Sequence, residues 1–210
     1  GGESIALSAT TLAPSLATQF PHLSNWPAFE VQATSGDIRS ALKGQLVVAG
    51  YNGSDELVMA TRVQIPGVLD DLYAYAGDLG AVINGSDVGY AVWAPTAQSV
   101  RLHAFDASGN LLPGYPVAMS ESDGVWRYTG SLAELNEQFY QYEVTVYHPR
   151  TDAIETTMVS DPYALSLSTN GQYAQVVDLD SAYKPAGWDS VEPPAVAAPE
   201  DVVVYEAHIR

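Results

Sequence analysis

Apolar and polar positions alternate with period two in two separate parts of the chain. In the first part, GQLVVAGYNGSDELVMATRVQI over residues 44–65, every second side chain from Leu57 to Ile65 is apolar or threonine. The NGSD sequence at 52–55 interrupts the alternation with residues that favour turns. The pattern predicts a β-hairpin, and SIALSATTL over residues 4–12 predicts one more strand upstream of it.

Two short helical patterns flank the predicted hairpin. SGDIRSALKG, residues 35–44, places Ile38, Ala41 and Leu42 on one side and ends on a glycine. PGVLDDLYAYAGDLG, residues 66–80, predicts a helical turn followed by a linker. Because both stretches are short, helix is expected to contribute little to the fold.

The second and stronger period-two pattern begins at Gly89. Strands are expected around 90–92, 100–104 and 124–130, with Gly, Pro and Asn between them. In FYQYEVTVYH, residues 139–148, Tyr and Val side chains occupy one face, and Gln, Glu and Thr occupy the other. Short strands with this spacing and one buried face predict an antiparallel β-sandwich.

The last fifty residues carry a weaker pattern. Residues 160–189 form a long connection with one strand-like piece at 174–179, and VEPPAVAAPE at 191–200 is a stiff proline-rich spacer. Three valines at 202–204 followed by YEAHIR at 205–210 predict the start of a buried strand. The pattern divides the chain into domains at residues 1–80 and 81–188 and a tail at 189–210.

Charge and composition limit the partners that this chain can have. Eight Lys and Arg residues against 25 Asp and Glu residues give a net charge of −17, which disfavours binding to nucleic acid or anionic membrane surfaces. A neutral ligand such as a sugar is not repelled. No apolar stretch of about twenty residues is present to span a membrane. The chain has no cysteine, so disulfides and thiolate chemistry are excluded.

The sequence offers no pattern for a metal or cofactor. Its four histidines are scattered, and its acidic cluster after residue 69 lacks the glycine-bearing loop of a calcium site. We therefore expect no metal and no cofactor.

Several stretches, in their order along the chain, closely resemble the N-terminal part of bacterial pullulanases, the debranching branch of the α-amylase family. Five of them are FPHLSNWPAFEV, TRVQIPGVLDDLYA, YAVWAPTAQSVRL, SDPYALSLSTNGQYAQVVDL and VVVYEAHIR. The first two resemble the small β domain that precedes the carbohydrate-binding-type module in secreted or surface-anchored pullulanases. The last resembles the first strand of the catalytic barrel.

The resemblance implies an all-β chain of two immunoglobulin-like β-sandwich domains, followed by the truncated first strand of a (β/α)8 barrel. It implies the non-catalytic front of an enzyme that hydrolyses α-1,6-glucosidic branch linkages, because the carboxylates of glycoside hydrolysis would lie in later barrel strands. The implied partners are an α-glucan (pullulan, starch or glycogen) and the protein's own catalytic barrel. The implied location is secreted or at the cell surface.

Three aromatic residues are candidates for stacking on sugar rings. Trp126 and Tyr128 share one face of the predicted 124–130 strand, and Trp26 lies in a loop between Asn25 and Pro27. Flat ring faces bind pyranose CH groups through such stacking. For Trp126 and Tyr128 the pattern favours packing in the core over sugar stacking. For Trp26 a role as a hydrophobic anchor is weighed equally with stacking.

A second set of residues is expected at a domain interface. Trp93 and Pro95 belong to the VWAP sequence, and Asp161, Pro162 and Tyr163 are expected to fold back onto the second sandwich.

The chain also departs from glycogen-binding relatives of this module. Where those carry F-N-x-W, this sequence reads Phe105, Asp106, Ala107, Ser108, and a second expected tryptophan is replaced at 148–151. The departure favours a structural role beside the barrel over starch binding by the module alone. A set of immunoglobulin-like adhesion modules without a glycan role is the alternative function.

Overall fold

The structure is a computed structural model that describes residues 3–181 and 183–207. The chain divides into two compact units, one ending at Val177 and the other beginning at Asp178. We call residues 3–71 the N-terminal region and residues 78–177 the sandwich; both belong to the first unit. No helix among the described residues is long and apolar enough to cross a membrane.

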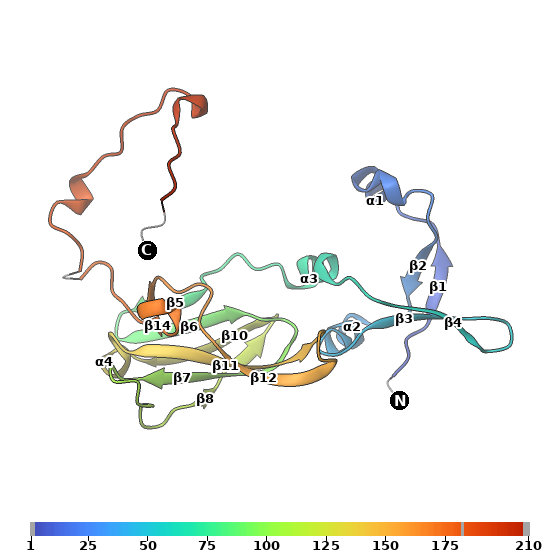
Figure 1. Cartoon of the computed structure of the whole chain (residues 1–210), viewed down its shortest axis with the longest axis horizontal. Helices are drawn as coiled ribbons and strands as arrows, with labels where there is room; N and C mark the ends of the chain where they lie inside the picture. The colour runs from blue at the N-terminus through green and yellow to red at the C-terminus, as the bar shows by residue number, and fades with distance from the viewer. Residues whose placement is uncertain (1–2, 182, 208–210) are drawn as a thin grey trace. The chain divides into compact units, whose positions relative to one another are not determined.

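The elements are short throughout (Figure 1). The N-terminal region and its connection contain β1 (Leu7–Thr10), α1 (Pro14–Gln19), η1 (Pro21–Leu23), β2 (Ala28–Val31), α2 (Ser35–Ala41), β3 (Val47–Tyr51), β4 (Leu57–Arg62) and α3 (Pro66–Tyr73). The sandwich contains β5 (Gly80–Asn84), β6 (Asp87–Trp93), β7 (Ala97–Phe105), β8 (Val117–Ala118), β9 (Ser120–Ser122), β10 (Val125–Ser131), α4 (Leu132–Leu135), β11 (Phe139–His148), β12 (Ala153–Val159), β13 (Ser166–Leu167), η2 (Thr169–Gly171) and β14 (Ala174–Gln175). The second unit contains η3 (Trp188–Ser190) and η4 (Pro199–Asp201).

The predicted elements of the N-terminal region are confirmed. β3 and β4 form the expected antiparallel hairpin, and its turn is stabilised by the Asn52 Oδ1, which accepts hydrogen bonds from the Ser54 and Glu56 amides. Helix α2 begins with a capping box: Thr34 Oγ1 accepts from the Asp37 amide at 3.2 Å, and the Asp37 carboxylate accepts from the Thr34 amide at 3.0 Å.

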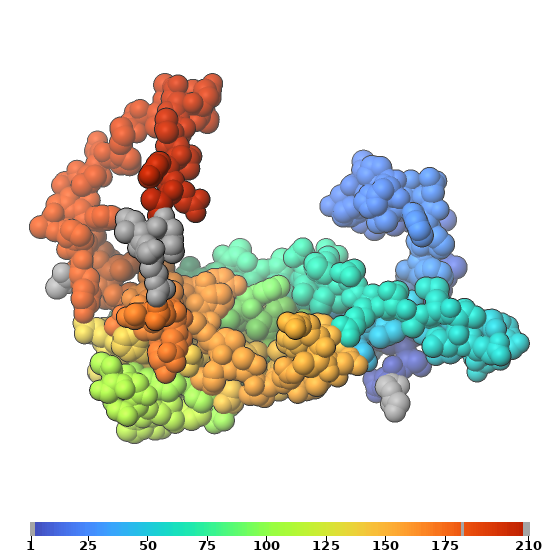
Figure 2. Space-filling model, in the orientation of Figure 1, coloured from blue at the N-terminus to red at the C-terminus, as the bar shows by residue number. Residues whose placement is uncertain are grey.

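The N-terminal region buries almost nothing by itself. Its strands form two separate two-stranded sheets, β1–β2 and β3–β4. Leu42 is the one buried side chain among residues 3–71, and large apolar side chains such as Val58 and Phe29 are 63% and 58% exposed. Figure 2 shows the β3–β4 hairpin projecting from the rest of the unit. Two-stranded sheets are marginally stable alone, so this region depends on its contacts with the sandwich.

The sandwich has the two layers that the sequence predicts, and the all-β class is confirmed. One sheet has the strand order β5-β6-β10-β9, and the other has the order β13-β14-β11-β7-β8, with β12 also paired to β11. The inward side chains form one continuous core: Val88, Tyr90, Val92, Ala97, Val100, Leu102, Ala104, Met119, Trp126, Leu135, Tyr140, Tyr142, Ala174 and Val176.

The antiparallel pair β7–β11 forms the centre of the second sheet. Tyr140 lies opposite Ala104 and Tyr142 opposite Leu102, so the inward face predicted for 139–148 is confirmed. The register shifts between Thr145 and Val146, where β7 contains Gln98 as an extra residue. Such a bulge changes the direction of a side chain at the strand end.

A buried carboxylate joins the segment after β12 to this core. Asp161 is 4% exposed. It accepts hydrogen bonds from the Tyr140 hydroxyl at 2.7 Å, the Tyr142 hydroxyl at 3.2 Å and the Tyr163 amide at 2.8 Å. The segment therefore folds back onto the sandwich, as expected.

Two ion pairs lie within the described part of the second unit. Lys184 pairs with Asp180 at 2.8 Å and with Asp189 at 2.6 Å. No strand forms among residues 202–207, where Val203 and Val204 are 92% and 85% exposed. The remaining residues of the expected barrel strand, 208–210, lie outside the described residues, so that strand stays a prediction.

We predict that Asp161→Ala lowers the free energy of unfolding of the sandwich by about 2–5 kcal/mol, because it leaves two buried tyrosine hydroxyls and one amide without their acceptor. Urea titration followed by tyrosine and tryptophan fluorescence measures this. Asp87→Ala, at an exposed position at the start of β6, is the matched control and should change stability by less than about 0.5 kcal/mol. Equal effects of the two changes would contradict the assigned role of Asp161.

We also predict a pH dependence that belongs to this carboxyl group. Burial raises the pKa of Asp161 above its ordinary value of 3.8. Between that value and the folded pKa, the native state keeps a proton that the unfolded state has released, so the contribution of Asp161 to stability falls as pH rises through this window and is constant above it. Comparing the wild type with Asp161→Asn by urea titration from about pH 3.5 to 8 isolates this slope. A wild-type advantage that grows with pH would show that the three hydrogen bonds outweigh burial.

Candidate functional site

The outward face of β7 and β11 carries three cross-strand pairs. Phe105 lies opposite Phe139, His103 opposite Gln141, and Arg101 opposite Glu143. All six alternate with residues of the core, so the same register that buries Tyr140 and Tyr142 presents these side chains to solvent.

Three rings gather at one end of this face, and we call Phe105, Phe139 and Tyr173 the aromatic strip. The centroid of the Tyr173 ring lies 5.1 Å from that of Phe105 and 6.4 Å from that of Phe139, in edge-to-face arrangements. Each ring is half-buried. Tyr173 reaches the strip because it immediately precedes β14, which pairs with the start of β11.

Polar groups border the aromatic strip and are connected by ion pairs and a hydrogen bond. Glu143 lies 3.0 Å from the Nε2 atom of His103 and 3.5 Å from the Arg101 guanidinium. The Gln141 amide donates to the Gln172 carbonyl at 2.8 Å. Rings flanked by amide, carboxylate and guanidinium groups suit a neutral ligand that has both CH faces and hydroxyl groups.

Trp126 and Tyr128 share a face, as predicted, but that face points into the sandwich. Trp126 is 7% exposed, and its Nε1 atom donates to the Ala94 carbonyl at 3.0 Å. The Tyr128 ring packs 6.4 Å from Tyr90 and 6.2 Å from Tyr115. Of these two predicted stacking candidates, Trp126 therefore presents no open ring face, and Tyr128 is packed among other tyrosines.

Trp26 has the open ring among the three predicted candidates. It is 71% exposed and follows η1 in the N-terminal region, where its amide donates to the Leu23 carbonyl at 3.0 Å. It belongs to a different part of the fold from the aromatic strip.

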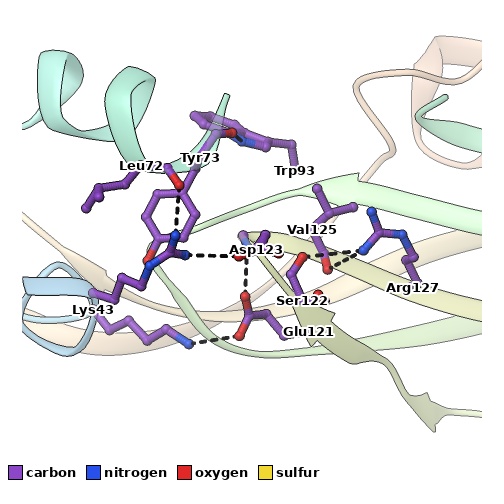
Figure 3. A network of polar contacts seen from close by, with 11 residues as sticks. Lys43, Leu72, Tyr73, Trp93, Glu121, Ser122, Asp123, Val125 and Arg127 are labelled. Atoms are coloured by element: carbon purple, nitrogen blue, oxygen red, sulfur yellow. Dashed lines mark hydrogen bonds and ion pairs between the residues drawn. The ribbon is translucent and has the colours of Figure 1, made fainter. Parts of the chain in front are cut away.

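The predicted interface residues Trp93 and Pro95 are covered from within the chain. The Nε1 atom of Trp93 donates to the Tyr73 carbonyl at 2.8 Å, and Pro95 is buried. The Arg127 guanidinium lies 5.3 Å from the centroid of the Tyr75 ring. Figure 3 shows Tyr73, Trp93 and Arg127 at the β6–β10 pair. The connection after α3 thus shields this part of the sheet.

The remaining interface candidates divide into a buried and an exposed part. Asp161 is in the core, whereas Pro162 is exposed and Tyr163 is 37% exposed. Two further apolar residues follow, Leu165 and Leu167, which are 72% and 52% exposed. We call the exposed residues Pro162, Tyr163, Leu165 and Leu167 the apolar edge.

Among the residues that the structure describes, no group of three or more His, Asp or Glu side chains is placed to hold a metal ion. The expectation of a site without a metal stays a prediction.

Sequence reasoning missed the aromatic strip because its three residues lie in three different segments. Phe105 and Phe139 were readable as outward positions of their strands, since each neighbours a residue of the inward set. Only the pairing of β7, β11 and β14 places Tyr173 beside them, and that pairing is not visible in any one segment.

Two family profiles match the chain. The Pullulanase N2 domain matches residues 1–71. Carbohydrate-binding module 48, also described as the isoamylase N-terminal domain, matches residues 78–164.

Individual relatives cover nearly all of the chain. Pullulanase of Klebsiella pneumoniae is 38% identical over 98% of this chain and 19% of its own length. Chloroplastic pullulanase 1 of Arabidopsis thaliana is 37% identical over 91% of this chain and 20% of its own length. The crystal structure of Klebsiella pneumoniae pullulanase complexed with maltotriose superimposes with a TM-score of 0.84 at 39% identity, covering 91% of this chain and 18% of that structure.

The chain thus spans about a fifth of the length of the relatives that it matches. The resemblance expected from the ordered sequence stretches is confirmed by both profiles and by the superposition. This chain comprises the N-terminal domains of a pullulanase, a Pullulanase N2 domain followed by a carbohydrate-binding module 48.

Proposed function

We propose that this chain is the non-catalytic, α-glucan-contacting front of an enzyme that hydrolyses α-1,6-glucosidic branch linkages in pullulan, starch or glycogen. Both matched profiles support an accessory role, and one of them is a carbohydrate-binding module. The proposed small β domain is residues 1–80, and the proposed binding-type module is residues 81–188. The proposed linker and first barrel strand are residues 189–210.

The aromatic strip is the observation that carries the proposal. It lies on the outward face of the central strand pair, within or next to the region matched by the carbohydrate-binding module. Its rings offer CH–π contacts, and Gln141 and His103 offer hydrogen-bonding partners for hydroxyl groups. This sequence lacks tryptophan at 105–108 and 148–151, and the strip is the proposed source of stacking contacts in their place. Trp26, with its open ring, is a second proposed contact.

The apolar edge is the proposed contact with the enzyme's own catalytic barrel. Contiguous exposed apolar side chains such as Tyr163, Leu165 and Leu167 mark protein contact surfaces in many soluble proteins. Trp93 and Pro95 contribute indirectly, because they support the sheet from its covered side.

The location of the parent enzyme is part of the same proposal. We propose a secreted or cell-surface enzyme, the location that the sequence resemblance implies. A chloroplastic relative covers the same region, so the domains themselves are compatible with more than one compartment.

We predict that the chain binds maltoheptaose and that Tyr173→Ala weakens binding roughly twofold to tenfold, the loss of one aromatic contact. Phe105→Ala should act similarly, and Tyr173→Phe should retain binding because the ring stays. Isothermal titration calorimetry measures the dissociation constants.

Tyr51→Ala is the matched control, because Tyr51 is 60% exposed on β3, away from the strip. Circular dichroism melting confirms that each variant is folded. Unchanged binding in folded Tyr173→Ala and Phe105→Ala, or equal loss in Tyr51→Ala, would refute the strip as the contact surface. Trp26→Ala in the same series tests the second contact.

We further predict that the purified chain releases no reducing ends from pullulan above a no-protein blank. Glycoside hydrolysis needs two suitably placed carboxyl groups, and the proposal assigns both to the catalytic barrel. Reproducible turnover by protein from two independent purifications would disprove the non-catalytic role.

A further inference from the structure

The N-terminal region and the sandwich are both acidic, although they are in contact. Residues 3–71 hold three Lys and Arg against seven Asp and Glu, a net charge of −4, and residues 78–177 hold three against eleven, a net charge of −8. At long range the two parts therefore repel each other. Their contact must depend on local interactions that overcome this repulsion.

All three cations of the N-terminal region make contacts outside it. They are Arg39 and Lys43, at and just after the end of α2, and Arg62 at the end of β4. We call Arg39, Lys43 and Arg62 the cation latch.

Arg39 binds at the β9–β10 turn. One guanidinium nitrogen donates to the Leu72 carbonyl at 3.0 Å, and another lies 3.4 Å from the Asp123 carboxylate. The guanidinium carbon lies 4.5 Å from the centroid of the buried Tyr73 ring. Figure 3 shows the three partners of this group, Leu72, Tyr73 and Asp123.

Lys43, four residues after Arg39, reaches the same turn. Its Nζ atom lies 3.8 Å from the Glu121 carboxylate and 5.6 Å from the centroid of the Trp126 ring. Glu121 is held in place by the Gly124 amide, which donates to it at 2.7 Å. The Lys43 carbonyl accepts from Gln98, the bulge residue of β7, at 3.0 Å.

Arg62 binds at the β11–β12 turn. Its guanidinium donates to the Pro149 carbonyl and lies 3.7 Å from the Asp152 carboxylate. The same carboxylate accepts from the Gln45 amide at 2.6 Å. The two parts are therefore joined at two separate turns of the sandwich.

These partners share one end of the sandwich, formed by the β6–β7, β9–β10 and β11–β12 connections, which we call the turn end. Asp123 and Asp152 both have left-handed backbones, with φ of 50° and 59°. Aspartate tolerates this conformation better than most residues, so both carboxylates are presented at the tips of their turns. Figure 1 places α2 near the end of β11 and the start of β12.

Apolar burial contributes little to this contact. Leu42 is the one buried side chain among residues 3–71 and lies between the latch residues in sequence. The ion pairs are partly exposed, since the Arg62 and Asp152 side chains are 51% and 54% exposed. Partly exposed pairs are individually weak and salt-sensitive, and several together define an orientation.

We propose that the cation latch is the interaction surface that fixes the N-terminal region on the turn end of the sandwich, and that the region swings away when the latch is removed or screened. Its partner is the set of acidic turns of the same chain, Glu121, Asp123 and Asp152. The β3–β4 hairpin, which ends at Arg62, is oriented by this contact.

Raising the ionic strength should weaken the latch. Raising salt from about 0.15 M to about 1 M shortens the Debye length from about 8 Å to about 3 Å. Long-range repulsion is already screened at the lower value, so the further increase weakens mainly the contact pairs. The fraction of molecules whose N-terminal region contacts the turn end is therefore expected to fall.

The experiment uses the absence of cysteine in the chain. Ser54→Cys in the β3–β4 turn and Ser108→Cys in the β7–β8 connection, both exposed, accept spin labels for pulsed electron paramagnetic resonance. We expect one narrow distance distribution at about 0.15 M salt and a broad one at about 1 M. The latch variant Arg39→Gln, Lys43→Gln, Arg62→Gln should be broad at both, with the ratio of docked to undocked molecules reduced about threefold to a hundredfold.

The control variant Arg101→Gln, Arg150→Gln, Lys184→Gln removes the same charge outside the latch and should stay narrow at about 0.15 M salt. The melting temperature of the sandwich should be close to wild type in both variants. A narrow distribution in the latch variant, or broadening in both variants, would overturn the proposal.

This outcome is independent of glucan binding. The aromatic strip lies at the Phe105–Phe139 end of β7 and β11, which is the opposite end from the turn end. The nine residues of β7 extend over about 30 Å, so the strip and the latch are far apart. The latch variant should therefore bind maltoheptaose as the wild type does, provided that the strip binds it.

Discussion

The antiparallel pairing of β7 with β11 is the interaction on which the rest of the structure depends. Side chains alternate between the two faces of a strand, so a slip of one residue would exchange the buried and exposed sets. The observed register places Tyr140 and Tyr142 in the core, where their hydroxyl groups hold Asp161. The same register places Phe105 and Phe139 outward and together. Core and candidate surface are thus two consequences of one pairing.

The sequence was sufficient to predict elements whose signal is local. The β3–β4 hairpin follows from its turn residues, α2 from its apolar side and terminal glycine, and the inward face of β11 from strict alternation. Trp126 packs in the core, the interpretation that the sequence favours over stacking, although alternation alone does not say which face of β10 is buried. Tyr173 joins the strip through pairing between distant segments. The bulge at Gln98 likewise has no local signal, since it depends on the partner strand.

The N-terminal region shows what a small β segment needs when it lacks a core. With Leu42 as its one buried side chain in residues 3–71, it cannot fix its own orientation by apolar packing. Contacts to two acidic turns supply that orientation instead, at the end of the sandwich opposite the aromatic strip. The proposed binding surface and the proposed docking surface can therefore change independently on the same pair of strands.

We propose that the outward face of β7 and β11 contacts α-glucan. The most direct measurement is a titration of the labelled chain with maltoheptaose followed by nuclear magnetic resonance of aromatic and amide signals. We predict that shifts concentrate at Phe105, Phe139, Tyr173 and their polar neighbours, while the inward signals of Tyr140 and Tyr142 stay in place. Shifts confined to other surfaces, or none at saturating maltoheptaose, would contradict it.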